Sequence, residues 1–312
     1  MKLSLVLAPY DSGHRHGGCG RGPEAILSGG LVERLMLAGH DVDVVDIGKV
    51  GDRQGREIAT GFAVCGAVAD KVSGARGTGR FPIVLTGNCL TASGAVAGEA
   101  ADSIVWFDQH GDINTPETSA HGFLDGMALA VALGLCWRPM AATIPGFRAI
   151  DPSRCLLVDA RDLDPDEAGL LETLPVIRGA CGDTPAKITE LAAAGAGRVH
   201  LHLDLDVHDP ARLQANRYTT PGGPDPDQVR LAVDCVARSA PVVGMTISAY
   251  DPAFDAGNEV PPAVGRLLVD FLASMERIGR TAAGPPCASS VCASAGPDGR
   301  PGNGVWIPAV SR

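Results

Sequence analysis

The feature that most constrains the fold is a series of short, continuously apolar segments that alternate with longer segments of helical periodicity. Continuous rather than alternating apolar runs are typical of strands buried on both faces of a parallel sheet. The predicted strands are Leu3–Ala8, Val42–Ile47, Pro82–Thr86, Ile104–Asp108, Cys155–Asp159, Val199–Asp204 and Val243–Ala249. The predicted helices are Pro23–Ala38, Arg53–Val72, Thr91–Ala101, Asp225–Ser239 and Pro261–Arg277. Strand–helix alternation with right-handed crossovers predicts an α/β fold, a three-layer doubly wound parallel sheet.

Length and composition place these elements in one large domain. The chain has 312 residues, and we assign residues 1–279 to a single α/β domain. From about residue 280 the sequence changes to Gly, Pro, Ser and Ala, so residues 280–312 are predicted to form a flexible C-terminal tail. Cys287 and Cys292 are interpreted as part of this tail rather than as metal ligands.

Charge, hydropathy and cysteine usage exclude several classes of protein. Lys and Arg total 26 against 36 Asp and Glu, and a dispersed net charge of −10 argues against nucleic-acid binding. No apolar run approaches the roughly 18 residues of a membrane span, and the N-terminal apolar run lacks the cleavage site of a signal peptide. The nine cysteines are scattered, several within apolar runs, which is typical of reduced thiols. We therefore expect a cytoplasmic protein without a nucleic-acid or membrane partner.

Acidic residues gather just after two of the predicted strands. Asp108, His110 and Asp112 occupy alternate positions after one strand, and Asp204 and Asp206 do so after another. Residues i and i+2 of an extended chain point to the same side, so each set aims at one place. Crowded carboxylates repel one another unless cations lie between them, and oxygen ligands with one imidazole suit Mn²⁺ best among common ions. The pattern predicts a divalent metal pair; the alternative is that these aspartates cap loops and helices.

Several motifs resemble those of the ureohydrolases, the family of arginase, agmatinase and formimidoylglutamase. The segments DQHGDINTPETS and LDLDVHDP are similar to the family motifs D-A-H-x-D-x-N and D-x-D-x-x-D-P. PYDSGHRHGGCGRGPEAI resembles the family's opening strand and G-P-x-A-I helix start, and RDLDPDE resembles its R-D-x-D-P-x-E stretch. The resemblance spans roughly residues 3 to 275. It implies an arginase-like α/β fold that holds two Mn²⁺ per chain.

The resemblance also implies a role for individual residues. Asp108 and Asp204 would bridge the two metals, and His110 and Asp206 would bind one of them. Asp112 would bind the other metal and transfer a proton during catalysis. The residues expected to contact an amino-acid-like substrate are Asn114, Asp162, Asp164 and Thr220. A turn-forming Asn and helix-capping Asp residues are the alternative interpretation of this set.

The first departure from the family pattern concerns a metal ligand. The family has G-D-H after the third predicted strand, and its His binds the first metal, whereas this chain has Gly87-Asn88-Cys89. Cys89 is either a thiolate ligand, which would shift the preference toward Zn²⁺, or no ligand, which would leave the first site partly occupied. His200 and His202, within the strand before Asp204, are interpreted as buried or paired side chains rather than as ligands.

Two further departures concern catalysis and the substrate. Arginases have a proton-shuttling His where this chain has Asp125, and His121 stands nearby, so both are candidate catalytic residues. Arginases and agmatinases have a guanidinium-binding Glu where this chain has Ala249. Without that carboxylate a cationic guanidinium loses an anchor, which favours a less basic N-hydroxyguanidine. N-hydroxyarginine hydrolysis is one activity of the family branch that has Cys in the first motif.

These features together predict an enzyme and leave two alternatives. We expect a binuclear manganese-dependent hydrolase that cleaves the C–N bond of a linear guanidino or N-hydroxyguanidino amino acid with a metal-activated hydroxide. One alternative is a formimino or acyl-amide hydrolase of the same fold. The other is a non-catalytic metal-binding member that has lost the first metal site. The resemblance also implies a homo-oligomer, a trimer or a hexamer.

Overall fold

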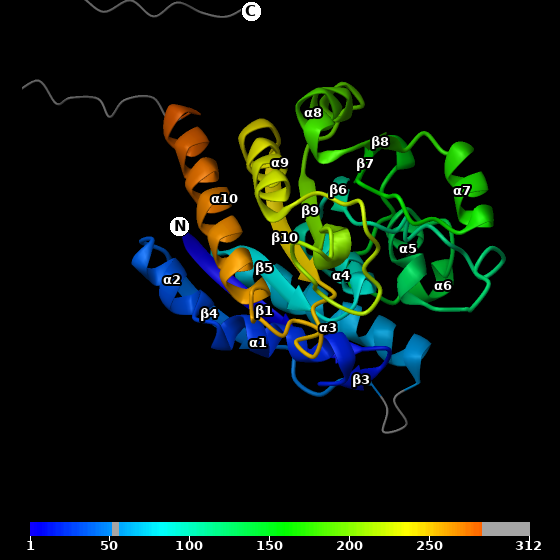
Figure 1. Cartoon of the computed structure of the whole chain (residues 1–312), viewed down its shortest axis with the longest axis horizontal. Helices are drawn as coiled ribbons and strands as arrows, with labels where there is room; N and C mark the ends of the chain where they lie inside the picture. Colours follow the sequence, from blue (N-terminus) through cyan, green and yellow to red (C-terminus); the bar gives the residue numbers. More distant parts are fainter. Residues whose placement is uncertain (52–55, 283–312) are drawn as a thin grey trace, which may run out of the picture.

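The computed structural model describes residues 1–51 and 56–282. At its centre is an eight-stranded sheet with the strand order β4-β1-β5-β10-β9-β6-β7-β8, and every neighbouring pair is parallel (Figure 1). Its strands are β1 (Lys2–Ala8), β4 (Asp41–Asp46), β5 (Phe81–Thr86), β6 (Ser103–Phe107), β7 (Cys155–Val158), β8 (Ile177–Gly179), β9 (Val199–Asp204) and β10 (Val242–Ser248). A two-stranded antiparallel hairpin, β2 (Tyr10–Asp11) and β3 (His14–Arg15), follows β1. The predicted parallel α/β fold is confirmed.

The residues of each strand fit its place in the sheet. The central strands β6 and β9 are buried along their whole length, as their continuous apolar runs predict. The edge strand β4 consists of three Asp and three Val residues and is exposed or half-buried throughout. Charged side chains on an edge discourage pairing with another chain.

Helices cover both faces of the sheet, which gives the three predicted layers. Figure 1 shows α8, α9 and α10 side by side over one face. The helices that pack on this face are α1 (Gly22–Ser28), α2 (Leu31–Leu37), α8 (Thr184–Ala193), α9 (Pro226–Ser239) and α10 (Val260–Ala282). The other core contains residues of α3 (Glu57–Gly77), α4 (Ala92–Glu99), α5 (Ala128–Ala132), α6 (Arg138–Ala141) and α7 (Pro165–Glu172).

Several predicted boundaries differ from the structure. The helix predicted at Pro23–Ala38 is two helices, because the chain breaks at Gly29 and Gly30, and Gly30 has a left-handed φ of 83°. β8 and the helices α5 to α8 were not predicted. α10 continues to Ala282, so the predicted tail boundary at residue 280 falls inside a helix. The rest of the predicted tail, with Cys287 and Cys292, lies outside the described residues.

Two expectations from composition can be compared with the described residues. None of the helices described is long and apolar enough to cross a membrane. All seven cysteines within residues 1–51 and 56–282 are free thiols, six of them buried. The cysteines of this part of the chain therefore behave as small core residues rather than as a disulfide framework.

The crossing of α3 and α4 depends on two glycines. A Cβ atom at Gly94 would lie 2.3 Å from the carbonyl oxygen of Cys65, and one at Gly98 would lie 2.6 Å from that of Ala69. Backbones can approach this closely only where no side chain intervenes. The crossing matters for the site, because α4 follows the turn at the end of β5 that carries Cys89.

We expect Gly94→Ala to destabilise the protein by about 1–3 kcal/mol, because the added methyl group forces α3 and α4 apart. Urea unfolding followed by circular dichroism measures this change. The matched control is Gly74→Ala in α3, where an added Cβ meets nothing within 4 Å. Since alanine favours a helix over glycine, the control should be stabilised by up to about 1 kcal/mol. Equal effects of the two substitutions would contradict this account of the crossing.

Candidate metal centre

The predicted metal ligands converge at the carboxyl edge of the sheet. β5, β10, β9 and β6 are consecutive neighbours in the sheet order. Cys89 follows β5, Asp204 ends β9, and Asp108 follows β6. Because parallel strands all end at the same edge, residues far apart in the sequence meet in one place.

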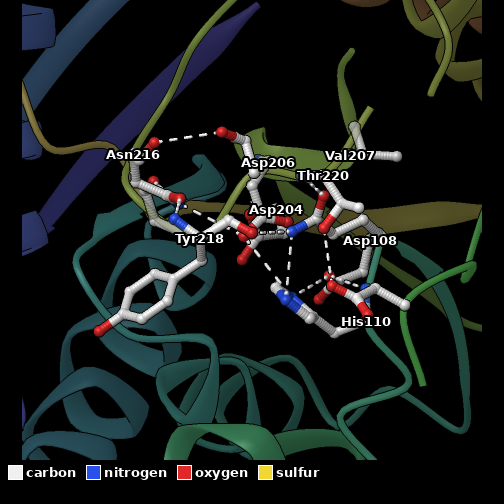
Figure 2. A network of polar contacts seen from close by, with 12 residues as sticks. Asp108, His110, Asp204, Asp206, Val207, Asn216, Tyr218 and Thr220 are labelled. Atoms are coloured by element: carbon white, nitrogen blue, oxygen red, sulfur yellow. Dashed lines mark hydrogen bonds and ion pairs between the residues drawn. The ribbon is translucent and has the colours of Figure 1, made fainter. Parts of the chain in front are cut away.

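The described residues contain two groups of side chains whose ligand atoms lie within 4.8 Å of one another. The first group is Cys89, Asp108, His202 and Asp204, and the second is Asp108, His110 and Asp206. Asp108 belongs to both, which is the arrangement of a carboxylate shared by two cations. Figure 2 shows His110 beside Asp108 and facing Asp206. Asp204, for which a bridging role was also expected, belongs to the first group only.

Local hydrogen bonds hold the carboxylates in place. The backbone N–H of His110 donates to Oδ1 of Asp108 at 2.7 Å, and that of Asp206 donates to Oδ1 of Asp204 at the same distance. The indole N–H of Trp106 donates to Oδ2 of Asp108 at 3.0 Å. The side-chain amide of Asn216 donates to Oδ2 of Asp206 at 3.3 Å (Figure 2). These donors fix the orientation of each carboxylate without neutralising it.

Burial and mutual repulsion shift the protonation of the site. Burial, followed by the nearby Asp206 and Asp108, raises the pKa of Asp204 well above its ordinary value. Burial raises the pKa of Asp206 to about 6, although His110 beside it acts in the opposite direction. Burial alone would lower the pKa of His110, but Asp206 and Asp108 raise it to about 10. In the metal-free chain these side chains therefore retain protons, which offset the negative charge that bound cations would balance.

Three buried atoms indicate that the residues fit a cation. Oδ2 of Asp112, Oδ1 of Asp206 and Nδ1 of His202 have no hydrogen-bond partner within the described part of the chain. Buried polar atoms are nearly always paired, so three unpaired ones at one site require an explanation. Carboxylates, an imidazole and a thiol are all ligands of divalent transition metals. Asp112, predicted as a ligand, lies in neither group but lines the cavity beside them.

His202 is the member of the site that sequence reasoning missed. We interpreted it as a buried or paired side chain, and it is indeed fully buried within β9, but it also joins the first ligand group. The signal was its position two residues before Asp204, which places both side chains on the same face of the strand. His200, two residues earlier, is paired as predicted, with Nδ1 2.8 Å from Oε2 of Glu99.

Asp125 and His121, the candidate catalytic residues, occupy different positions. One carboxylate oxygen of Asp125 accepts from the backbone N–H of Cys89 at 3.1 Å, and the other accepts from that of Leu90 at 2.9 Å. The side chain of Asn88 also donates to Asp125 at 2.9 Å. Burial raises the pKa of Asp125 to about 7. Its carboxylate therefore holds the turn that carries Cys89, while His121 is exposed at the cavity wall.

A cavity of about 340 Å³ opens onto the ligand groups. Among the predicted substrate residues, Asn114, Asp162 and Asp164 line it. The side chain of Asn114 donates to Oδ2 of Asp164 at 3.1 Å. Thr220 is not in the wall, but its hydroxyl donates to Oδ2 of Asp162 at 2.7 Å. The four residues thus form two hydrogen-bonded pairs on one side of the site.

Other residues of the cavity wall were not singled out from the sequence. They include Asp11, Cys19, Phe123, Glu167 and Tyr218. The rings of Phe123 and Tyr218 lie 6.1 Å apart at the cavity wall, on loops that follow β6 and β9. Only the folded chain brings them together. Glu167 had a sequence signal, since it ends the RDLDPDE motif, and it accepts from the backbone N–H of Ile113 at 3.0 Å.

Comparison with known proteins gives the family. A model of the arginase family matches residues 1–273. The chain belongs to the arginase family. An arginase of Bacillus caldovelox is 28% identical over 283 residues, covering 82% of this chain and 93% of that protein. The structure of arginase from Bacillus cereus has a TM-score of 0.78 at 27% identity, covering 87% of this chain and 98% of that one.

A more distant neighbour shows how widely the fold is shared. Proclavaminate amidino hydrolase from Streptomyces clavuligerus has a TM-score of 0.66 at 18% identity, over 88% of this chain and 92% of that one. Family membership confirms the predicted resemblance to ureohydrolases. It also confirms the predicted enzyme class, because arginase-family proteins are hydrolases of amidino C–N bonds.

The raised pKa values predict how stability responds to pH. In the metal-free protein, Asp206 and Asp125 keep protons to about pH 6 and 7, whereas unfolded carboxyls lose them near 3.8. The native state therefore binds more protons in that window, and these groups contribute stability that is lost as pH rises from about 4 to 7. A bound cation favours deprotonated ligands, so its stabilising effect should grow over the same range.

Melting curves of chelated and Mn²⁺-supplemented protein test this expectation. The difference in melting temperature should be about 5 °C larger at pH 7.5 than at pH 5. A difference that stays constant or shrinks with rising pH would mean that the carboxyl cluster does not bind the cation.

Proposed function

We propose that this protein is a binuclear manganese-dependent hydrolase of a linear guanidino or N-hydroxyguanidino amino acid. The observation that carries the proposal is the pair of ligand groups that share Asp108, four of whose members line an acidic cavity. Cys89, His202 and Asp204 would complete one site, and His110 and Asp206 the other. The donor set suits Mn²⁺, and the thiol of Cys89 allows Zn²⁺ at the first site.

Two divalent ions, when bound, supply Lewis acidity and lower the pKa of a shared water. The remaining chemistry belongs to the protein. Asp112 is 5% exposed and lines the cavity beside the ligand groups. Its carboxylate would bind one of the cations and, from that position, pass a proton to the leaving nitrogen. Asp125 and His121 are the other proposed proton carriers, although the hydrogen bonds of Asp125 also give it a structural role.

The cavity favours a cationic or polar nitrogen compound. Its wall contains Asp11, Asp162, Asp164 and Glu167 in addition to the metal-ligand candidates. A negatively lined cavity attracts positive charge, and Asn114, Asp162, Asp164 and Thr220 are the groups proposed to contact the amino-acid part of the substrate. Ala249 lines the same cavity and offers no carboxylate to a guanidinium. The N-hydroxyguanidino substrate is favoured for that reason.

The alternatives make different demands on these residues. A formimino or acyl-amide hydrolase would also tolerate Ala249, and its product would be formamide or a carboxylate. A non-catalytic member would lack the first metal site, yet the first ligand group has four members. The trimer or hexamer and the cytoplasmic location remain predictions from the family resemblance and the composition.

We expect purified wild-type protein supplemented with Mn²⁺ to contain two metal equivalents per chain, and Asp108→Ala to contain none. Asp108 is the side chain shared by both groups, so its removal weakens both sites. Elemental analysis of desalted protein measures this. The control is Asp227→Ala, because Asp227 is an exposed residue of α9 outside the site. One equivalent or none in the wild type would favour the non-catalytic alternative.

We expect Ala249→Glu to raise kcat/KM for arginine relative to N-hydroxyarginine by about tenfold, which corresponds to about 1.4 kcal/mol. The added carboxylate would pair with the more basic guanidinium. Urea and hydroxyurea release measure the two reactions. Ala253→Glu, on an exposed position outside the cavity wall, is the charge-matched control. A ratio that moves equally in both variants would contradict the role assigned to position 249.

A further inference from the structure

Ser248 is a buried hydroxyl that contacts two members of the first ligand group at once. Its Oγ lies 3.1 Å from Sγ of Cys89 and 3.3 Å from Nε2 of His202. The residue is 1% exposed. It is not one of the grouped ligands, so its contacts require a separate explanation.

The sheet order explains how one hydroxyl reaches both side chains. β10, which Ser248 ends, lies between β5 and β9. Ser248 is paired in register with Asp204, so it stands at the level of the metal ligands. Cys89 approaches from the turn after one neighbouring strand, and His202 approaches from within the other.

One arrangement of these hydrogen bonds leaves a nitrogen of His202 free to bind a cation. The thiol of Cys89 donates to Oδ2 of Asp204 at 2.8 Å. Its sulfur can then accept from the hydroxyl of Ser248, whose oxygen in turn accepts from Nε2–H of His202. In this arrangement each proton has one acceptor. It leaves a lone pair on Nδ1 of His202, and that buried nitrogen has no partner among the described residues.

A second hydroxyl–histidine pair lies in the same two strands, and comparison with it shows what distinguishes the pair of Ser248 and His202. Oγ1 of Thr246 lies 2.9 Å from Nε2 of His200, as Ser248 does from His202. The other ring nitrogen of His200 is occupied by Glu99 at 2.8 Å. His202 has no such second partner within residues 1–51 and 56–282, and its ring stacks on Trp106, with centroids 3.6 Å apart. Of these two pairs, that of Ser248 and His202 has a ring nitrogen without a partner in the described part of the chain.

The geometry assigns Ser248 as a positioning residue of the first metal site. Its hydroxyl orients the sulfur of Cys89 and the imidazole of His202 so that both act on one cation. It also fixes the tautomer of His202, as partners of metal-binding histidines do. In this way a thiol and an imidazole from different strands form one ligand pair. The inference rests on the metal centre of the proposed function.

The test compares Ser248→Ala with the matched control Thr246→Val in the full chain. Metal-free protein is titrated with Co²⁺, and calorimetry gives the dissociation constants. The absorption band of a thiolate bound to Co²⁺ gives an independent readout of Cys89. We expect Ser248→Ala to weaken the first site by about 10–100-fold and to reduce the thiolate band. Thr246→Val should leave both properties close to the wild-type values.

The outcomes distinguish the role of Ser248 from the proposed function. Wild-type affinity and an unchanged band in Ser248→Ala would overturn the role of Ser248, as would an equal loss in both variants. If Ser248→Ala does not fold, Ser248→Thr and Ser248→Val replace it, and only the variant with a hydroxyl should keep the band. A wild type that binds two cations and hydrolyses the substrate would uphold the proposed function whatever the variants do. A wild type without any thiolate band would overturn both the role of Ser248 and that of Cys89.

Discussion

Negative charge buried at one edge of the sheet is the constraint on which the rest of the structure depends. Asp108, Asp204 and Asp206 are 1%, 3% and 2% exposed, and all belong to adjacent strands or the turns after them. Unpaired carboxylates in such a place would strongly oppose folding. Protonation and the nearby His110 relieve part of the repulsion in the metal-free chain, and cations would relieve it more completely. The helices on both faces hold the strands in place despite this repulsion.

Two residues at the site have an uncommon backbone conformation. Asp112 and Ala249 both have left-handed φ angles, of 50° and 61°, which residues with a side chain rarely adopt. Each is secured by a hydrogen bond to its carbonyl oxygen, from the backbone N–H of Ala130 at 3.0 Å and from the side chain of Asn216 at 2.7 Å. Such conformations persist where surrounding contacts fix them, and they turn the chain sharply after β6 and β10. Asn216 therefore joins the end of β10 to Asp206.

The sequence predicts features for which burial produces a local pattern, and it does not predict features that depend on contacts with neighbouring strands. The strands at the centre of the sheet were predicted because burial on both faces requires continuous apolar runs. β8 was not predicted, because Ile177–Gly179 is short and lies partly exposed at the edge of the sheet. The aspartates after β6 and β9 were found from their spacing. The spacing of His202 from Asp204 places both side chains on one face of the strand, but it does not show that Cys89 lies beside them, because Cys89 follows another strand.

The proximity of Cys89 and His202 bears on the alternative that the protein has lost its first metal site. Seen alone, Cys89 removes an imidazole that the family uses at the first metal, which suggests a degenerate site. In the folded chain an imidazole from β9 lies in the same group, so this group still offers an imidazole beside the thiol. A thiol and a fully buried histidine at the sheet edge make a softer, less hydrated site than carboxylates would. A substitution in one motif can therefore be balanced by a residue on a nearby strand, and whether a site has been lost must be judged from the whole group rather than from the motif.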